Sequence, residues 1–188
     1  MDINVLQKIA DTLNSNNISW GLGASSMLYF HGLVKEPNDI DVIVDEADAQ
    51  RASALLSKMA TSIETDDGKG KYATKYFYEM KILGQAVDLI GGYRIMRGDW
   101  IYDFPVLKKI ELKSECIGES NIPLTDIEDW YVAYLIMGDP KKRTALIESY
   151  VEIQNGFKNM DQLRKAVDQI QEKAPYETEI LERIGTWL

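Results

Sequence analysis

Residues 18–44, ISWGLGASSMLYFHGLVKEPNDIDVIV, decide the fold that we expect for this chain. Residues 18–21 form a short apolar segment that predicts a buried strand running into Gly23. Residues 25–30 then carry apolar side chains in a helical pattern, and Gly32 follows where a helix would end. Residues 39–44 have the alternation of a strand, with Ile40, Val42 and Val44 facing one way. The stretch therefore predicts a strand, a glycine-rich turn, a helix and a second strand.

The rest of the chain surrounds this unit with helices and a hairpin. We expect an amphipathic helix in residues 2–13, a helix in residues 45–59 capped by Asp45, and a hairpin formed by residues 72–80 and 82–90. Residues 125–128, Thr-Asp-Ile-Glu, have the form of a capping box, and three or four short helices follow it. The expected fold class is α/β (α+β), a mixed β-sheet flanked by helices in residues 1–123, followed by a helical subdomain in residues 124–188.

Composition narrows the chemistry. The chain has 188 residues, a formal net charge of -9 and a pI near 4.7, which disfavours non-specific binding to a phosphate backbone. It has one cysteine, Cys116, and one histidine, His31, so we expect any metal to be held by oxygen ligands, as Mg²⁺ or Mn²⁺ would be. No signal-peptide pattern or membrane span is visible, so we expect a cytoplasmic protein with no membrane partner.

Asp39 and Asp41 are the first candidates for chemistry. Side chains at positions i and i+2 of a strand lie on one face, about 6.5 to 7 Å apart. Ile40, Val42 and Val44 would anchor the other face in the core. Two carboxylates placed in this way can share a divalent cation with phosphate oxygens. The alternative is that both aspartates are solvated residues on an edge strand.

Two further features support a metal-binding role for Asp39 and Asp41. The turn at Gly23, Ala24, Ser25 and Ser26 would let a phosphate approach backbone N–H groups and hydroxyls, although it can equally be no more than a tight turn. It lacks the Gly-Lys-Ser/Thr of a P-loop. Asp88 lies in an otherwise apolar strand, where a shared metal would offset its burial. The alternative partner of Asp88 is an ion pair with Arg94 or Lys81.

Cations and aromatic residues give weaker signals. Lys35 precedes the Asp-x-Asp strand and Arg94 follows Asp88, and both could contact nucleotide phosphates. Residues 141–143, Lys-Lys-Arg, have the wrong sign for a helix N-terminus and hint at an anionic partner. Tyrosines could stack on a nucleobase, but aromatic residues at strand spacing more often form cross-strand pairs; the candidates are Tyr29, Tyr72, Tyr76 and Tyr78. Trp130 is interpreted as a packing residue.

The order of these parts resembles the polymerase-beta-like nucleotidyltransferase superfamily. The shared parts are the glycine-rich turn, the helix, the Asp39-Ile40-Asp41 strand and the later strand with Asp88. The nearest likeness is to small bacterial proteins related to lincosamide nucleotidyltransferases and to nucleotidyltransferase toxins. The chain departs from the pattern at Ala24, where the family has glycine or serine, and in a somewhat long gap before Asp39.

The resemblance implies a Mg²⁺-dependent nucleotidyltransferase that transfers a nucleoside monophosphate from a nucleoside triphosphate, such as ATP, to a hydroxyl group. Asp39, Asp41 and Asp88 would be the catalytic and metal-binding residues, with Asp88 either a ligand or a general base. Gly23, Ala24, Ser25, Ser26, Lys35 and Arg94 would bind the nucleotide. As the acceptor we expect a small molecule, such as an antibiotic or sugar, in preference to RNA or protein. The alternative is a catalytically inactive nucleotide-binding or toxin/antitoxin-type module with the same fold.

Overall fold

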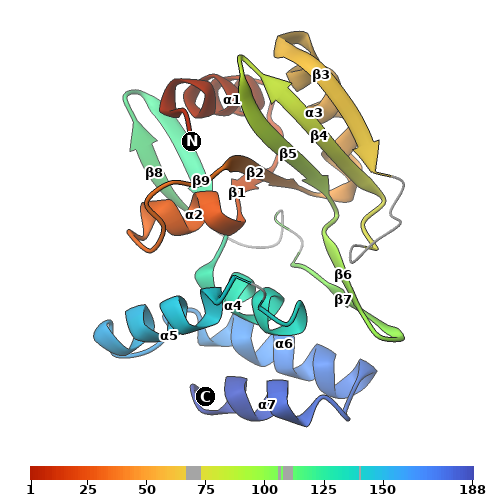
Figure 1. Cartoon of the computed structure of the whole chain (residues 1–188), viewed down its shortest axis with the longest axis vertical. Coiled ribbons are helices and arrows are strands. Elements are labelled where there is room, and N and C mark those ends of the chain that lie inside the picture. The colour runs from red at the N-terminus through yellow and green to blue at the C-terminus, as the bar shows by residue number, and fades with distance from the viewer. Residues whose placement is uncertain (67–72, 106, 108–111, 140) are drawn as a thin grey trace.

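A seven-stranded mixed sheet forms the upper part of the molecule in the computed structural model, which describes residues 1–66, 73–105, 107, 112–139 and 141–188 (Figure 1). The strand order is β3-β4-β5-β2-β1-β9-β8. Their bounds are β1 Trp20–Leu22, β2 Asp39–Val44, β3 Ala60–Asp66, β4 Tyr76–Ile82, β5 Gln85–Gly91, β8 Lys113–Ile117 and β9 Ser120–Leu124. The pairs β2–β5 and β1–β9 are parallel, whereas the other pairs are antiparallel. The predicted mixed sheet with flanking helices is confirmed.

Helices α1 (Ile3–Ser15) and α3 (Ala49–Leu56) contact each other and pack on the sheet. In α1 the apolar positions recur at helical spacing, so its buried side chains form one face. The Asp2 side chain accepts hydrogen bonds from the N–H groups of Asn4 and Val5 and caps the helix. The short helix α2 (Ala24–Phe30) connects β1 to β2 and packs on β2.

The C-terminal part is helical, as predicted, and lies below the sheet in Figure 1. It contains α4 (Ile127–Ile136), α5 (Arg143–Ile153), α6 (Met160–Lys173) and α7 (Thr178–Gly185). Every residue of α4 is buried, because this helix contacts α2 on one side and the other three helices elsewhere. A two-stranded ribbon, β6 (Arg94–Arg97) and β7 (Trp100–Asp103), extends beside these helices. The division between residues 123 and 124 stays a prediction.

Two local predictions are wrong, and one strand was not predicted. Strand β3 lies in a segment for which we expected neither a helix nor a strand. Asp45 does not cap a long helix, since its carboxylate accepts the backbone N–H of Leu107 at 2.7 Å and the helix is divided into α3 and two short 3-10 segments. The capping box at Thr125 does not form, because Glu128 accepts the N–H groups of Lys158 and Asn159 instead.

The predicted hairpin forms from β4 and β5, which join through Leu83 and Gly84. Tyr72, the first residue of the predicted hairpin, and most of the turn before it lie outside the described residues, and β4 begins at Tyr76. In the described part of the chain, no helix combines the length and the apolar character that a membrane crossing requires.

Candidate active site

Strands β2 and β5 bring three carboxylates together. Asp41 lies opposite Asp88 in the parallel register, and Asp39 is two residues before Asp41 on the same face. One carboxylate oxygen from each of the three residues lies within 4.8 Å of the others. The edge-strand alternative is wrong, because β2 lies between β5 and β1 in the sheet. The three side chains form a group that can hold a divalent cation through oxygen ligands alone.

Ser26 on α2 supports this group through hydrogen bonds to β2. Its hydroxyl accepts the backbone N–H of Asp41 at 3.1 Å and lies 2.9 Å from the carbonyl oxygen of Asp39 and 3.3 Å from the Asp41 carboxylate. The Ser26 side chain is fully buried. The Ser26 hydroxyl is therefore bonded to β2, and its contact with a nucleotide stays a prediction.

The glycine-rich turn is tied to the same strand. The N–H of Gly23 donates to the carbonyl oxygen of Asp41 at 2.8 Å. A Cβ atom at Gly23 would lie 2.6 Å from the ring of Trp130 and 2.7 Å from Ile43. Gly23 is therefore required for close packing of α2, β2 and α4, a role different from the phosphate approach that we predicted. Ala24 follows with φ 44, the left-handed conformation that glycine adopts at lower cost.

The electrostatics of the three carboxylates favour a bound cation. Burial, together with the charges of Asp39 and Asp88, raises the pKa of Asp41 to about 8. Burial, together with the charges of Asp39 and Glu79, raises the pKa of Asp88 to about 6. Like charges this close disfavour full ionisation, and a divalent cation would reverse that penalty. In the described part of the chain Asp88 makes no ion pair with Arg94 or Lys81.

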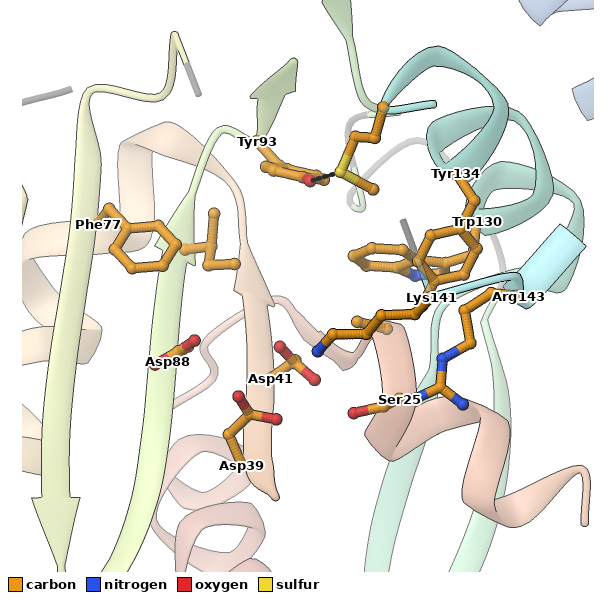
Figure 2. A pocket seen from close by; sticks show the side chains of 13 residues that line it. Ser25, Asp39, Asp41, Phe77, Asp88, Tyr93, Trp130, Tyr134, Lys141 and Arg143 are labelled. Atoms are coloured by element: carbon orange, nitrogen blue, oxygen red, sulfur yellow. Dashed lines mark hydrogen bonds between the residues drawn. The ribbon is translucent and has the colours of Figure 1, made fainter. Parts of the chain in front are cut away.

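The carboxylates line one side of a cavity of about 180 Å³ (Figure 2). Ser25, Lys141 and Arg143 lie across from them, where the Lys141 side chain reaches toward Asp41 and the Arg143 guanidinium lies beside Ser25. Ala24 also lines the cavity. Among the described residues, neither of these two cationic side chains forms an ion pair or a hydrogen bond. The site thus places negative and positive groups on opposite sides of one space.

Two predicted nucleotide-binding residues lie elsewhere. Arg94 forms ion pairs with Glu46 at 3.3 Å and Asp103 at 3.0 Å and lines a different cavity. Lys35 is exposed in the connection between α2 and β2 and does not line the cavity. The cationic side chains that line the cavity with the carboxylates are instead those of Lys141 and Arg143. The sequence signal for those two was the run of cations at a helix start, where the helix dipole disfavours them.

The remaining lining of the cavity is aromatic and apolar, and sequence reasoning missed most of it. These residues are Phe77, Ile90, Tyr93, Trp130, Tyr134 and Met137. They come from β4, β5, the loop after β5, α4 and the residue after α4. No local pattern joins positions so far apart in the chain, and in α4 no face stands out because every residue of the helix is buried.

Comparison with known proteins gives structural matches alone. No protein-family model and no curated protein sequence matches the chain. Its structure is similar to that of a "putative nucleotidyltransferase" from Thermotoga maritima, with a TM-score of 0.62, 26% identity and coverage of 80% of this chain and 92% of that one. It is also similar to ANT(2'')-Ia in complex with adenylyl-2''-tobramycin, with a TM-score of 0.54, 10% identity and coverage of 80% and 88%.

A solution structure of the antibiotic-resistance factor ANT(2'')-Ia gives a similar result, with a TM-score of 0.53, 12% identity and coverage of 80% and 83%. The fold is similar to that of nucleotidyltransferases, which agrees with the resemblance drawn from the sequence.

Proposed function

We propose that the protein transfers a nucleoside monophosphate from a nucleoside triphosphate to a hydroxyl group of a small molecule. The observation that carries this proposal is the facing arrangement, across one cavity, of three carboxylates and two cations that form no ion pair with any described residue. A metal–triphosphate complex has the matching charges, because its cation suits Asp39, Asp41 and Asp88 while its outer phosphates suit Lys141 and Arg143. A neutral ligand would leave both sets of charges unused.

Asp39, Asp41 and Asp88 would hold Mg²⁺ or Mn²⁺. When bound, such a metal neutralises phosphate charge and orients the phosphates. The donor set fits these ions, since all ligands are carboxylate oxygens and burial with mutual repulsion makes the group a strong site for a cation. Ser26 fixes the direction of Asp41 and so preorganises the site.

The chain's own residues then account for the transfer. The acceptor hydroxyl oxygen forms a bond to the α-phosphorus, and the bond from this phosphorus to the oxygen bridging toward the β-phosphorus breaks. Pyrophosphate leaves against Lys141 and Arg143, which balance its charge. The hydroxyl proton passes to a carboxylate or water, and Asp88 is placed to receive it if it does not ligate the metal. Positioning and charge neutralisation supply most of the rate enhancement.

A small-molecule acceptor is favoured over RNA by the acidic character of the whole chain, with its net charge of -9. The structural similarity to ANT(2'')-Ia, solved with adenylyl-2''-tobramycin, supports the same choice. Among small molecules, hydroxylated antibiotics and sugars are the first acceptors to test.

The test measures nucleoside triphosphate binding by calorimetry in the presence of Mg²⁺ or Mn²⁺. We expect metal-dependent binding to the wild type and none to the Asp39→Asn/Asp41→Asn variant. Asp161→Asn is the matched control, because Asp161 is exposed on α6 and pairs with Arg164. If the wild type binds no nucleoside triphosphate with either metal, the proposal is wrong. Pyrophosphate release with a panel of hydroxylated acceptors then separates an enzyme from a module that binds without turnover.

A further inference from the structure

Arg143 begins helix α5 directly after a connection that contains unfavourable backbone conformations. Asp139 and Lys142 both adopt the left-handed conformation, with φ values of 44° and 53°. Residues other than glycine rarely adopt it, because Cβ then lies too close to the following carbonyl oxygen. Such residues persist only where surrounding contacts hold them, and they are common at sites that bind ligands. The contacts that hold this connection therefore determine the point from which the Arg143 side chain enters the cavity.

The carboxylate of Asp139 provides the first of these contacts. It accepts the backbone N–H groups of Arg143, at 2.5 Å, and of Thr144, at 3.1 Å, at the start of α5. It also accepts the hydroxyl of Thr144. The first N–H groups of a helix have no partner within it, and the helix dipole stabilises a carboxylate beside them. Asp139 thus fixes the backbone of Arg143, while the guanidinium extends into the cavity beside Ser25 (Figure 2).

Arg183 on α7 extends this contact to the C-terminal helix. Its Nη2 group donates to the Thr144 hydroxyl oxygen at 3.2 Å, so the same hydroxyl accepts from Arg183 and donates to Asp139. The Arg183 guanidinium also donates two hydrogen bonds to Glu148, at 2.8 and 3.0 Å. Hydrogen bonds that end on a cation or an anion are stronger than neutral ones, and neighbouring bonds in a chain polarise one another. Thr144 is 1% exposed, so little water competes for this link.

Glu148 connects the same guanidinium to the centre of the helical part. It lies on α5 and accepts the hydroxyl of Tyr131, a fully buried residue of α4, at 2.8 Å. The Nε1–H of Trp187 donates to that hydroxyl at 3.2 Å. Arg183 is thus held through Glu148 by both α4 and α5, and it holds Thr144 in turn.

We propose that Arg183 and Thr144 are positioning residues for Arg143, and that through Asp139 they direct this cation toward the outer phosphates of the nucleoside triphosphate. The inference rests on the function proposed above. Neither Arg183 nor Thr144 lines the cavity, so each acts on the substrate only through Arg143. Helix α7 then contributes to the site itself, because it holds a cation across the cavity from the carboxylates of the sheet.

The experiment is a double-mutant cycle on the full chain. Calorimetry measures the affinity for the tightest-binding of the α,β-methylene analogues of ATP, GTP, CTP and UTP, with Mg²⁺. Thr144→Val removes the hydroxyl and keeps the shape of the side chain, and we expect it to weaken binding about three- to tenfold. In the Arg143→Ala background the same change should have almost no effect, because the guanidinium is absent while the backbone N–H at position 143 remains. Thr144→Ser should recover the wild-type affinity.

Two controls separate positioning from stability and from net charge. Ile147→Val loosens the packing of a fully buried residue of α5 and leaves these hydrogen bonds intact, so it should not change the affinity. Arg183→Gln repeats the cycle from α7 and replaces Thr144→Val if that variant does not fold. Arg164→Gln is its matched control, since Arg164 carries the same charge, is exposed on α6 and pairs with Asp161.

Two results would overturn the inference and spare the proposed function. One is an unchanged affinity in Thr144→Val and Arg183→Gln. The other is a loss of affinity that is as large in the Arg143→Ala background as in the wild type, or that the control variants share, because the effect would then not act through Arg143. If the wild type binds none of the four analogues, the proposed function is contradicted and the inference is wrong with it.

Discussion

Asp41 on β2 and Asp88 on β5 lie directly opposite each other in a parallel strand pair. Parallel pairing sets the same register position of two strands side by side, and here both positions carry a carboxylate on the same face. Asp39 joins them from the same strand as Asp41. Side chains from adjacent central strands are held by the hydrogen bonds of the sheet, so the spacing of the carboxylates is built into the backbone. A metal site on such a support needs little reorganisation to bind its ion.

Metal-free stability should fall as the pH rises, because of Asp41. The pKa of its carboxyl is raised from 3.8 to about 8 in the folded protein, so the native state binds more protons than the unfolded state between these values. The free energy of unfolding therefore decreases as pH rises from about 4 to 8. Asp88, whose pKa is raised to about 6, adds to the decrease between about 4 and 6.

Denaturant unfolding in EDTA across this pH range measures the effect. Asp41→Asn removes the charge, so at pH 8 the metal-free variant should be more stable than the wild type by more than about 1 kcal/mol. Added Mg²⁺ should stabilise the wild type and leave the variant nearly unchanged. Equal pH profiles for the two proteins would show that Asp41 ionises at little cost.

Ser26→Ala should be destabilising, because Ser26 is buried and its hydroxyl accepts the backbone N–H of Asp41. Leaving that N–H without a partner costs about 1 to 3 kcal/mol of stability. The Mg²⁺ affinity should also fall, since the Asp41 carboxylate loses its fixed direction. Ser25→Ala is the neighbouring control, because Ser25 lines the cavity and is only partly buried. A loss of stability in Ser25→Ala equal to that in Ser26→Ala would contradict the assignment.

The sequence predicted the strand–turn–helix–strand unit correctly because its signals are local. The alternation of side chains in residues 39–44 and the positions of the glycines determine the structure of only a few neighbouring residues. The three carboxylates also followed from the sequence, since an acid in an apolar strand is unusual wherever its neighbours are buried. The tyrosines of β4 were interpreted as packing residues, and Tyr76 and Tyr78 stack on each other with ring centroids 6.4 Å apart. Phe77, which lines the cavity, was not among the candidates.

Other parts depended on contacts that no local pattern records. Thr125 and Glu128 have capping-box spacing, but both side chains find partners far away in the chain, at Leu22 and at Lys158 and Asn159. Arg94 is near Asp88 in sequence, yet Glu46 and Asp103 are nearer in space. Tertiary contacts override local preference at such positions.

Gly23→Ala should destabilise the protein by about 1 to 3 kcal/mol, the range for overpacking in a core. The added Cβ would approach the Trp130 ring to 2.6 Å and Ile43 to 2.7 Å, so α4 or β2 would have to move. Gly185→Ala is the matched control, because nothing lies within 4 Å of a Cβ there and helix propensity favours alanine. Thermal unfolding of both variants gives the comparison. Unchanged stability in Gly23→Ala would show that the contact relaxes easily.

Lys141→Ala and Arg143→Ala should each weaken nucleoside triphosphate binding by about tenfold, which corresponds to about 1.4 kcal/mol for one charge-assisted contact with phosphate. Both side chains line the cavity opposite the carboxylates. Lys142→Ala is a close control, since it removes the same charge from the residue between them, which is exposed and does not line the cavity. Calorimetry at two salt concentrations separates local contacts from the general effect of net charge. Equal losses of nucleoside triphosphate affinity in Lys141→Ala, Lys142→Ala and Arg143→Ala would mean that Lys141 and Arg143 act only through the net charge. The phosphate site would then lie elsewhere in the cavity.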